Sequence, residues 1–197
     1  MDLKVYREYT KVTRRFKEAE LVLKNAKIIN VFTNEIITGD IAIEDGMIVG
    51  IGNYEGKQEH DMTGKYVCPG FIDSHLHLES TLVTPKELVT VASRHGTTTF
   101  IVDPHESANV SGLAGINYIL DQTEDASANV FVMMPSCVPA TSIDDNGCTL
   151  TAEDMTQYLD NERILGLGEV MDYISVVNAD PGMHRKLDLF KNKVRDG

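Results

Sequence analysis

Two histidines one residue apart stand in the segment DSHLHLE, residues 73–79. The preceding PGFI predicts a buried strand that ends here, and in a strand the side chains of residues two apart point to the same side. His75 and His77 would therefore present two imidazoles to one point at the carboxyl end of that strand, as half of a divalent-metal site. An ordinary pair of polar histidines is the alternative, but their position directly after PGFIDS favours the metal site.

Three ionisable side chains, Asp103, His105 and Glu106, directly follow the apolar run TTTFIV. This run predicts the next strand, so the three groups would lie at its carboxyl end. Beside a metal they are candidates for proton transfer or for hydrogen bonding to a polar ring. A second interpretation stays open, because Asp103-Pro104 is also a common loop sequence and His105 could simply cap the following helix.

Glu169 stands in GLGEVMD, residues 166–172, at the end of the fourth expected strand. The glycines on both sides of Leu167 permit close approach of the backbone. A lone carboxylate leaving a buried segment is costly unless it meets a cation, so a metal-bridging role fits. The alternative is a glutamate that has already reached solvent in the loop.

The three motifs fall on strand ends of one predicted sheet, so a single convergent metal site explains all of them. Imidazole and carboxylate ligands suit Zn, Mn, Fe or Co, and the motifs contain no cysteine that would indicate thiolate ligation. Such a metal would lower the pKa of bound water to about 7 and supply hydroxide at neutral pH.

The elements that would position these residues change character along the chain. Residues 1–19 predict an amphipathic leading helix, and residues 20–66 predict a small β-meander of short β-branched runs separated by turns. From residue 67 to residue 197, buried strands alternate with helical segments. The apolar side chains at helical spacing in the leading helix are Val5, Tyr9, Val12 and Phe16.

This alternation predicts an α/β fold with parallel strands, either a doubly wound sheet or a (β/α)8 barrel. Histidines and carboxylates follow the first strand, where a dinucleotide-binding sheet would carry a glycine-rich fingerprint, so the barrel is favoured. A complete barrel usually needs about 250 residues, and residues 67–197 hold about half of that. We therefore expect the first four βα units of a barrel, preceded by a small N-terminal β-domain part.

Composition argues against a nucleic-acid or membrane partner. The 197 residues are 42% hydrophobic, and 30 acidic against 18 basic side chains give a net charge of -12 without a Lys/Arg block. Three cysteines far apart predict neither a disulfide framework nor a zinc knuckle, which suits the cytoplasm. We expect neither a signal peptide nor a membrane span, because the N-terminal segment is charged throughout and long apolar windows are lacking.

The segment PGFIDSHLHLEST resembles the amidohydrolase superfamily, in which an N-terminal β-segment precedes a barrel whose first strand ends in H-x-H. VDPHE and GLGEVMD are similar to the adenine deaminases in particular, and the resemblance covers nearly the whole chain from about residue 20. It implies hydrolytic deamination of adenine, a small purine, to hypoxanthine and ammonia by a metal-activated hydroxide.

By this resemblance, His75 and His77 would bind one metal of a two-metal centre, and Glu169 would bridge both metals. Mn or Fe is the expected metal, with Zn as an alternative. Relatives acting on cyclic amides, such as dihydroorotases and hydantoinases, commonly use a carboxylated lysine as the bridge. GLGEVMD contains no lysine, which favours the deaminases.

Asp103, His105 and Glu106 match the DPHE of that family and would lie near the purine. We expect His105 to bind the substrate. Acid/base catalysis is expected of Glu106 before Asp103, because Asp103 is nearer the strand and could be a ligand or an orienting group.

The family's other metal ligands, two histidines and an aspartate from later strands, have no counterpart in this sequence. We therefore expect the N-terminal fragment of a longer enzyme, with negligible activity by itself and forming a homo-oligomer when full length. Two alternatives stay open. One is a different amidohydrolase that cleaves a cyclic amide, and the other is a truncated, non-catalytic fragment.

Overall fold

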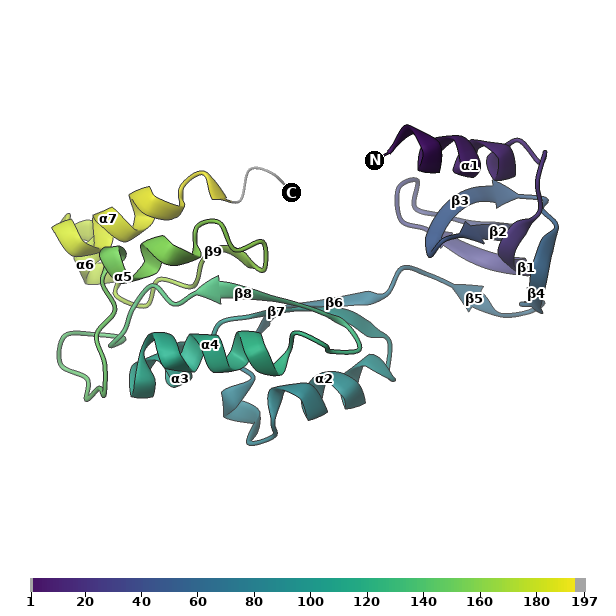
Figure 1. Cartoon of the computed structure of the whole chain (residues 1–197). Coiled ribbons are helices and arrows are strands. Elements are labelled where there is room, and N and C mark those ends of the chain that lie inside the picture. The colour runs from purple at the N-terminus through teal and green to yellow at the C-terminus, as the bar shows by residue number, and fades with distance from the viewer. Residues whose placement is uncertain (1, 194–197) are drawn as a thin grey trace. The chain divides into compact units, whose positions relative to one another are not determined.

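The computed structural model describes residues 2–193. The chain divides into two compact units, with the boundary between Pro69 and Gly70, and each unit contains its own β-sheet (Figure 1). Within the described residues, no helix is long and apolar enough to cross a membrane.

The first unit begins with helix α1 (Leu3–Thr13). Asp2 caps its start, because one carboxylate oxygen accepts a hydrogen bond from the backbone N–H of Lys4 at 3.0 Å. Val12 is completely buried and packs against the sheet residues Val22 and Ala42. Thr13 adds polar contacts, because its hydroxyl donates to the carbonyl oxygen of Val49 at 2.8 Å and its own carbonyl accepts from Tyr54 Oη at 3.2 Å. The last turn therefore attaches the helix to the sheet.

The expected extension of the helix as far as residue 19 is wrong. Thr13 is the last helical residue, and Arg15 has a φ of 61°, a left-handed conformation that cannot continue a right-handed helix. Phe16 was expected on the apolar face, yet it lies beyond the helix and is 72% exposed. The chain turns here to enter the strand that starts at Ala19.

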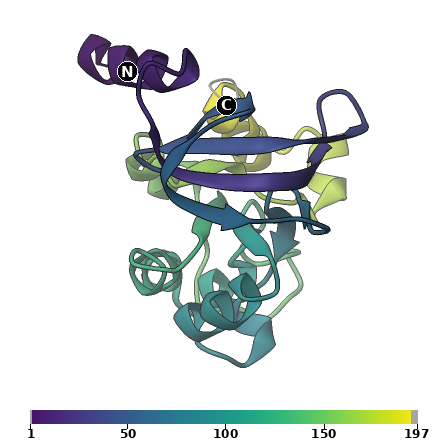
Figure 2. The same ribbon diagram turned by 90° about the vertical axis from the view of Figure 1, so that its right-hand side faces the viewer.

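The sheet of the first unit is only in part the expected meander. Strand β1 pairs antiparallel with β2, and β2 pairs antiparallel with β3, but β4 and β5 both pair with β1 in parallel. Figure 2 shows β1 and β2 as two long neighbouring strands. The 12-residue length of β1 leaves room for β4 and β5 one after the other along its second edge. The strands are β1 (Ala19–Asn30), β2 (Glu35–Glu44), β3 (Met47–Gly52), β4 (Gly56–Asp61) and β5 (Tyr66–Val67).

Asp40 is a buried carboxylate in β2 that connects three segments of this unit. It accepts hydrogen bonds from Lys24 Nζ at 2.8 Å, from the N–H of Asn25 at 2.9 Å and from the N–H of Tyr54 at 3.0 Å. Burial raises the pKa of Asp40, but the bonds from Lys24 and the two backbone groups outweigh it, so the pKa lies below its usual value. The carboxylate is thus held ionised, and its loss would leave the ammonium of Lys24 with the carbonyl oxygen of Tyr54 but without its ion-pair partner.

Asp40→Ala should lower the free energy of unfolding by about 2 kcal/mol at neutral pH, because charge-assisted hydrogen bonds contribute about 1.5–3 kcal/mol. A depressed pKa stabilises the fold above the unfolded-state value of about 3.9, and this contribution disappears as the pH falls through the folded-state value. The free energies of unfolding of wild type and variant, measured in urea, should therefore approach each other progressively as the pH falls below about 4. Glu35→Ala, an exposed carboxylate on the same strand, serves as the control, and an equal loss in both variants would contradict the role given to Asp40.

The second unit is an α/β fold with parallel strands, as predicted. Its described strands lie in the order β6-β7-β8-β9, each parallel to the next. Helices α2, α3 and α4 lie along one face of these strands (Figure 1), and α7 contacts β9. The strands are β6 (Phe71–Leu76), β7 (Thr97–Val102), β8 (Asn129–Met134) and β9 (Ile164–Leu167). The helices are α2 (Pro85–Ser93), α3 (His105–Ser111), α4 (Leu113–Gln122), α5 (Ala152–Met155), α6 (Tyr173–Val177) and α7 (Pro181–Phe190), with 3-10 turns η1 (Glu79–Thr81) and η2 (Thr156–Tyr158).

The core of this unit forms between the strands and their covering helices. Phe100 and Val102 of β7 are buried with Val132 of β8, and Ile116 and Ile119 of α4 pack against them. Side chains alternate in a strand, so the burial of every second residue in β7 and β8 sets the direction in which the remaining residues point. Parallel strands also bring all their carboxyl ends to one edge, where the predicted site residues follow.

Candidate metal centre

His75 and His77 lie together at the end of β6, as the H-x-H spacing predicted. Their Nε2 atoms are 3.2 Å apart. Glu169, which follows β9, brings its Oε1 to 3.5 Å from His77 Nε2 and 3.8 Å from His75 Nε2. Three ligand atoms from two strand ends separated by about ninety residues in sequence therefore converge on one point.

The position of Glu169 depends on the backbone before it. Asp103 Oδ2 accepts a hydrogen bond from the N–H of Glu169 at 3.0 Å. A Cβ atom on Gly168 would lie 2.2 Å from the same Oδ2, so only glycine permits this approach. The glycine of GLGE thus lets the β9 terminus approach the carboxylate that follows β7.

The spacing of these atoms fits a divalent metal. Two nitrogens each about 2.0–2.1 Å from one tetrahedral zinc ion lie about 3.3 Å apart, close to the observed 3.2 Å between the two Nε2 atoms. His75 and Glu169 are about half exposed at their side chains, so an ion could reach this point from solvent. The residues present therefore match the donor set and spacing of part of a metal site.

Glu106 lies on the other side of the His77 ring. Its Oε2 is 3.1 Å from His77 Nδ1, and its Oε1 accepts a hydrogen bond from Ser80 Oγ at 2.9 Å. An ionised carboxylate can only accept, so Nδ1 must carry the proton and the lone pair of Nε2 is left facing His75 and Glu169. This is the tautomer that a metal at Nε2 requires.

Glu79 adds a second carboxyl group next to Glu106. Burial raises the pKa of Glu79, and the neighbouring Glu106 raises it further, while its Oε1 accepts a hydrogen bond from the N–H of Ser107 at 3.1 Å. Burial also raises the pKa of Glu106, but hydrogen bonds, the largest from Ser80, outweigh it and the pKa lies below its usual value. Glu106 is therefore the ionised member of the pair, and Glu79 retains its proton to higher pH.

Asp103 and His105 form the buried side of the site, with exposures of 0% and 5%. Asp103 Oδ1 lies 2.6 Å from His105 Nδ1 without hydrogen-bond geometry, and His105 Nε2 has no hydrogen-bond partner within residues 2–193. Buried polar atoms without partners are costly, so this side is suited to a polar ligand or a cation. His105 is the first residue of α3 and Pro104 takes the cap position, so the interpretation of His105 as only a helix cap is wrong.

A cavity of about 440 Å³ opens in front of these groups. Its lining includes His77, His105, Glu106 and Glu169, and it is large enough for a small heterocycle. Each of the six residues that sequence analysis selected thus lies in this cavity wall or in direct contact with a residue that does.

Sequence reasoning missed Glu79 and Ser136, which both contact the site. Glu79 could have been found, because it lies two residues after His77 in the same motif. Ser136 follows β8 and donates a hydrogen bond to the carbonyl oxygen of Glu169. Nothing in the local sequence of NVFVMMPS indicates that contact, because it joins residues 33 positions apart.

Residues 66–193 match the amidohydrolase family. The chain belongs to this family. Among curated members, an adenine deaminase of Desulfitobacterium hafniense (strain Y51) is 60% identical over 181 residues, covering 92% of this chain and 32% of that relative. An adenine deaminase of Clostridium acetobutylicum is 52% identical over 183 residues, which again cover 92% of this chain and 32% of that relative. The chain therefore spans about a third of the length of the curated relatives it matches.

Solved amidohydrolases share the fold. Atrazine chlorohydrolase from Arthrobacter aurescens TC1, in complex with zinc, superposes with a TM-score of 0.51 at 14% identity, covering 71% of this chain and 41% of that one. The N-acyl-D-glutamate deacylase of Bordetella bronchiseptica, also a zinc complex, gives a TM-score of 0.51 at 17% identity, covering 90% and 42%. At such identities the likeness concerns the arrangement of the chain alone.

His77→Asn should weaken Zn²⁺ binding to this chain by about 100-fold, because it removes one nitrogen donor and the contact that orients Glu106. Calorimetric titration measures the affinity. His95→Asn is the matched control, since His95 is exposed and precedes β7 at the opposite end of the strand. Equal affinities in the two variants would mean that zinc binds elsewhere.

Proposed function

We propose that this chain is part of an enzyme that hydrolyses adenine to hypoxanthine and ammonia with the help of divalent metal. The observation that carries the proposal is the convergence of His75, His77 and Glu169 on one point beside a cavity. The 60% and 52% identities to adenine deaminases support the choice of substrate.

We also propose that β6 to β9 are the first four strands of a (β/α)8 barrel, and that the first unit is part of a composite β-sandwich. Their parallel order along the chain supports the barrel. Phe71 and Ile72 of the edge strand β6 are each 63% exposed, which suits a strand that is covered by further elements in a longer protein. The chain spans about a third of the relatives' length, so a protein of their length would have room for such elements.

In this proposal His75 and His77 hold one metal of a two-metal centre, and Glu169 bridges it to the second. Glu169 belongs to two groups of ligand-type side chains, one with His75 and His77 and one with Asp103 and His105, which supports a bridging position. Mn or Fe is the proposed metal, with Zn as an alternative. When bound, the metal lowers the pKa of water and so provides hydroxide at neutral pH.

The remaining residues bind the purine and move protons. Addition of hydroxide would form the C6–O bond while a ring nitrogen gains a proton. The hydroxyl proton would then pass to the exocyclic amine, so that the C6–N bond breaks, ammonia leaves and C6=O remains. Glu106 is the proposed acid/base group, and Asp103 the second candidate, with its carboxylate already committed to the N–H of Glu169. His105 Nε2 is a buried ring nitrogen without a partner among the described residues, which supports hydrogen bonding to the purine.

Formation of hypoxanthine from adenine tests the function directly. With Mn, Fe or Zn supplied, we expect activity in a version of the protein extended to the length of its relatives and negligible activity in these 197 residues. Activity in neither would contradict the proposal and favour hydrolysis of a cyclic amide. Activity in the short chain would mean that its own residues complete the metal site.

Glu106→Gln in the extended protein should lower kcat by about 100-fold or more, because an amide cannot transfer the proton. The amide oxygen still accepts from His77 Nδ1, so metal content should change little. Steady-state kinetics and metal analysis measure the two effects. The matched control is Glu124→Gln, an exposed residue of the loop after α4. Full turnover in Glu106→Gln would remove Glu106 from the mechanism.

A further inference from the structure

We propose that Ser136 and Lys186 are positioning residues that fix Glu169 through its own peptide group. Neither residue lines the cavity at the metal centre. Both act from behind the site, and the inference rests on the proposed metal role of Glu169. It concerns how tightly the centre holds metal.

Ser136 is completely buried in the segment after β8. Its hydroxyl donates a hydrogen bond to the carbonyl oxygen of Glu169 at 2.5 Å. On the other side of the same residue, the N–H of Glu169 donates to Asp103 Oδ2 at 3.0 Å. Two buried side chains from the ends of β7 and β8 therefore hold both polar groups of the Glu169 backbone, and its half-exposed carboxylate extends from a fixed base.

Lys186 secures Ser136 in turn. It lies on α7, is 9% exposed, and its Nζ donates a hydrogen bond to the carbonyl oxygen of Ser136 at 2.8 Å. Burial lowers the pKa of Lys186. The carboxylates of Asp154, Asp172 and Asp180 oppose this shift from a distance. None of the described residues forms an ion pair with the ammonium, and its direct partner is the carbonyl oxygen of Ser136. A costly arrangement of this kind suits a residue with a role beyond packing.

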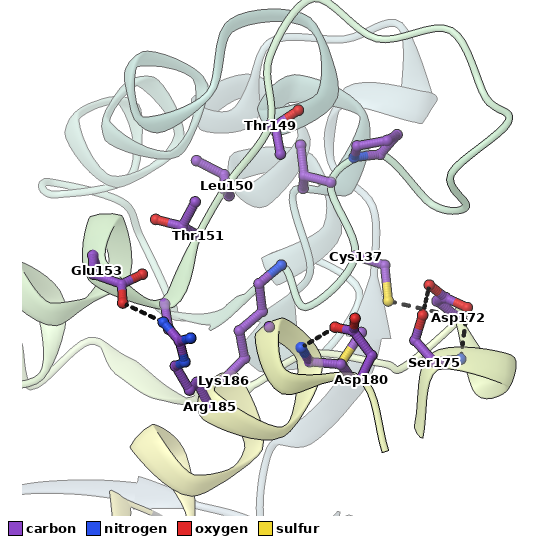
Figure 3. A pocket seen from close by; sticks show the side chains of 15 residues that line it. Cys137, Thr149, Leu150, Thr151, Glu153, Asp172, Ser175, Asp180, Arg185 and Lys186 are labelled. Carbon is purple, nitrogen blue, oxygen red and sulfur yellow. Dashed lines mark hydrogen bonds and ion pairs between the residues drawn. The ribbon is translucent and has the colours of Figure 1, made fainter. Parts of the chain in front are cut away.

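Figure 3 shows how the two neighbouring cations of α7 differ. Arg185 turns to Glu153, with an exposed ion pair of 3.1 Å, whereas Lys186 extends into the wall of a separate cavity of about 320 Å³. Cys137 lines both this cavity and the one at the metal centre. Cys137 therefore lies between the two cavities, and Lys186, which lines the second cavity, holds the backbone of the adjacent Ser136.

The inference predicts that metal affinity depends on these two residues and does not simply follow fold stability. Ser136→Ala and Lys186→Met should each weaken Zn²⁺ binding by about 10- to 100-fold, because residues that orient a ligand typically contribute that much. Ser136→Thr keeps the hydroxyl, and Lys186→Arg keeps a cationic donor beside a cavity with room for it, so both should bind within a few-fold of wild type. Calorimetric titration of the chain gives the affinities.

The control separates positioning from ordinary packing. Thr123 is also buried, at 3% exposed, and its hydroxyl donates to the carbonyl oxygen of Ile119, away from Glu169. Thr123→Ala should lower the free energy of unfolding in urea and leave zinc affinity unchanged. Ser136→Ala should lower both.

If folded Ser136→Ala and Lys186→Met bind zinc as tightly as wild type does, the inference is overturned. A loss of zinc affinity in His77→Asn would in that case still support the proposed metal centre. If Lys186→Met fails to fold, the Ser136→Ala and Ser136→Thr pair decides the matter. Unchanged affinity in His77→Asn as well would place the failure in the proposed centre itself. A loss in Thr123→Ala equal to that in Ser136→Ala would also overturn the inference, because the effect would then follow stability.

Discussion

The buried carboxylate of Asp103 holds the candidate site together. One oxygen accepts the N–H of Glu169 and the other lies against the ring of His105, so the ends of β7 and β9 are linked through a single side chain. A carboxylate with no exposure is tolerated only where its neighbours compensate it. The absence of a Cβ on Gly168 makes this approach possible, and a larger residue there would force the two strand ends apart.

From this link, the site divides into an open and a closed side. His75 and Glu169 are about half exposed and face the point where ligand atoms converge. Asp103 and Ser136 are buried and hydrogen-bond to the backbone of Glu169 from behind, and His105 is buried beside Asp103. Ligand atoms that solvent can reach allow a metal to enter, and buried hydrogen bonds keep those atoms where they are. In the proposed centre, the residues that position Glu169 thus differ from the residues that would coordinate the metal, although all lie at the same edge of the sheet.

Glu106 shows why a residue's place in a motif does not fix its chemistry. The DPHE segment predicted a proton-transfer group, and the structure adds a second contact, to the far nitrogen of His77. That contact sets the tautomer on which the proposed coordination depends. The pKa of the nearby Glu79 shifts in the opposite direction from that of Glu106, because Glu79 is more deeply buried, whereas hydrogen bonds, the largest from Ser80, outweigh burial at Glu106.

The sequence by itself determined the parallel α/β class and selected six candidate residues that the structure brings close together, because alternating apolar runs and polar residues at their ends are local patterns. It predicted neither the early end of α1 nor the parallel pairing of β4 with β1, since strand partners depend on contacts between distant segments. Only the tertiary structure decided that Ser136 reaches Glu169 and that Lys186 reaches Ser136. Hydrogen bonds between residues 33 and 50 positions apart follow from how helix and sheet pack, which no local pattern records.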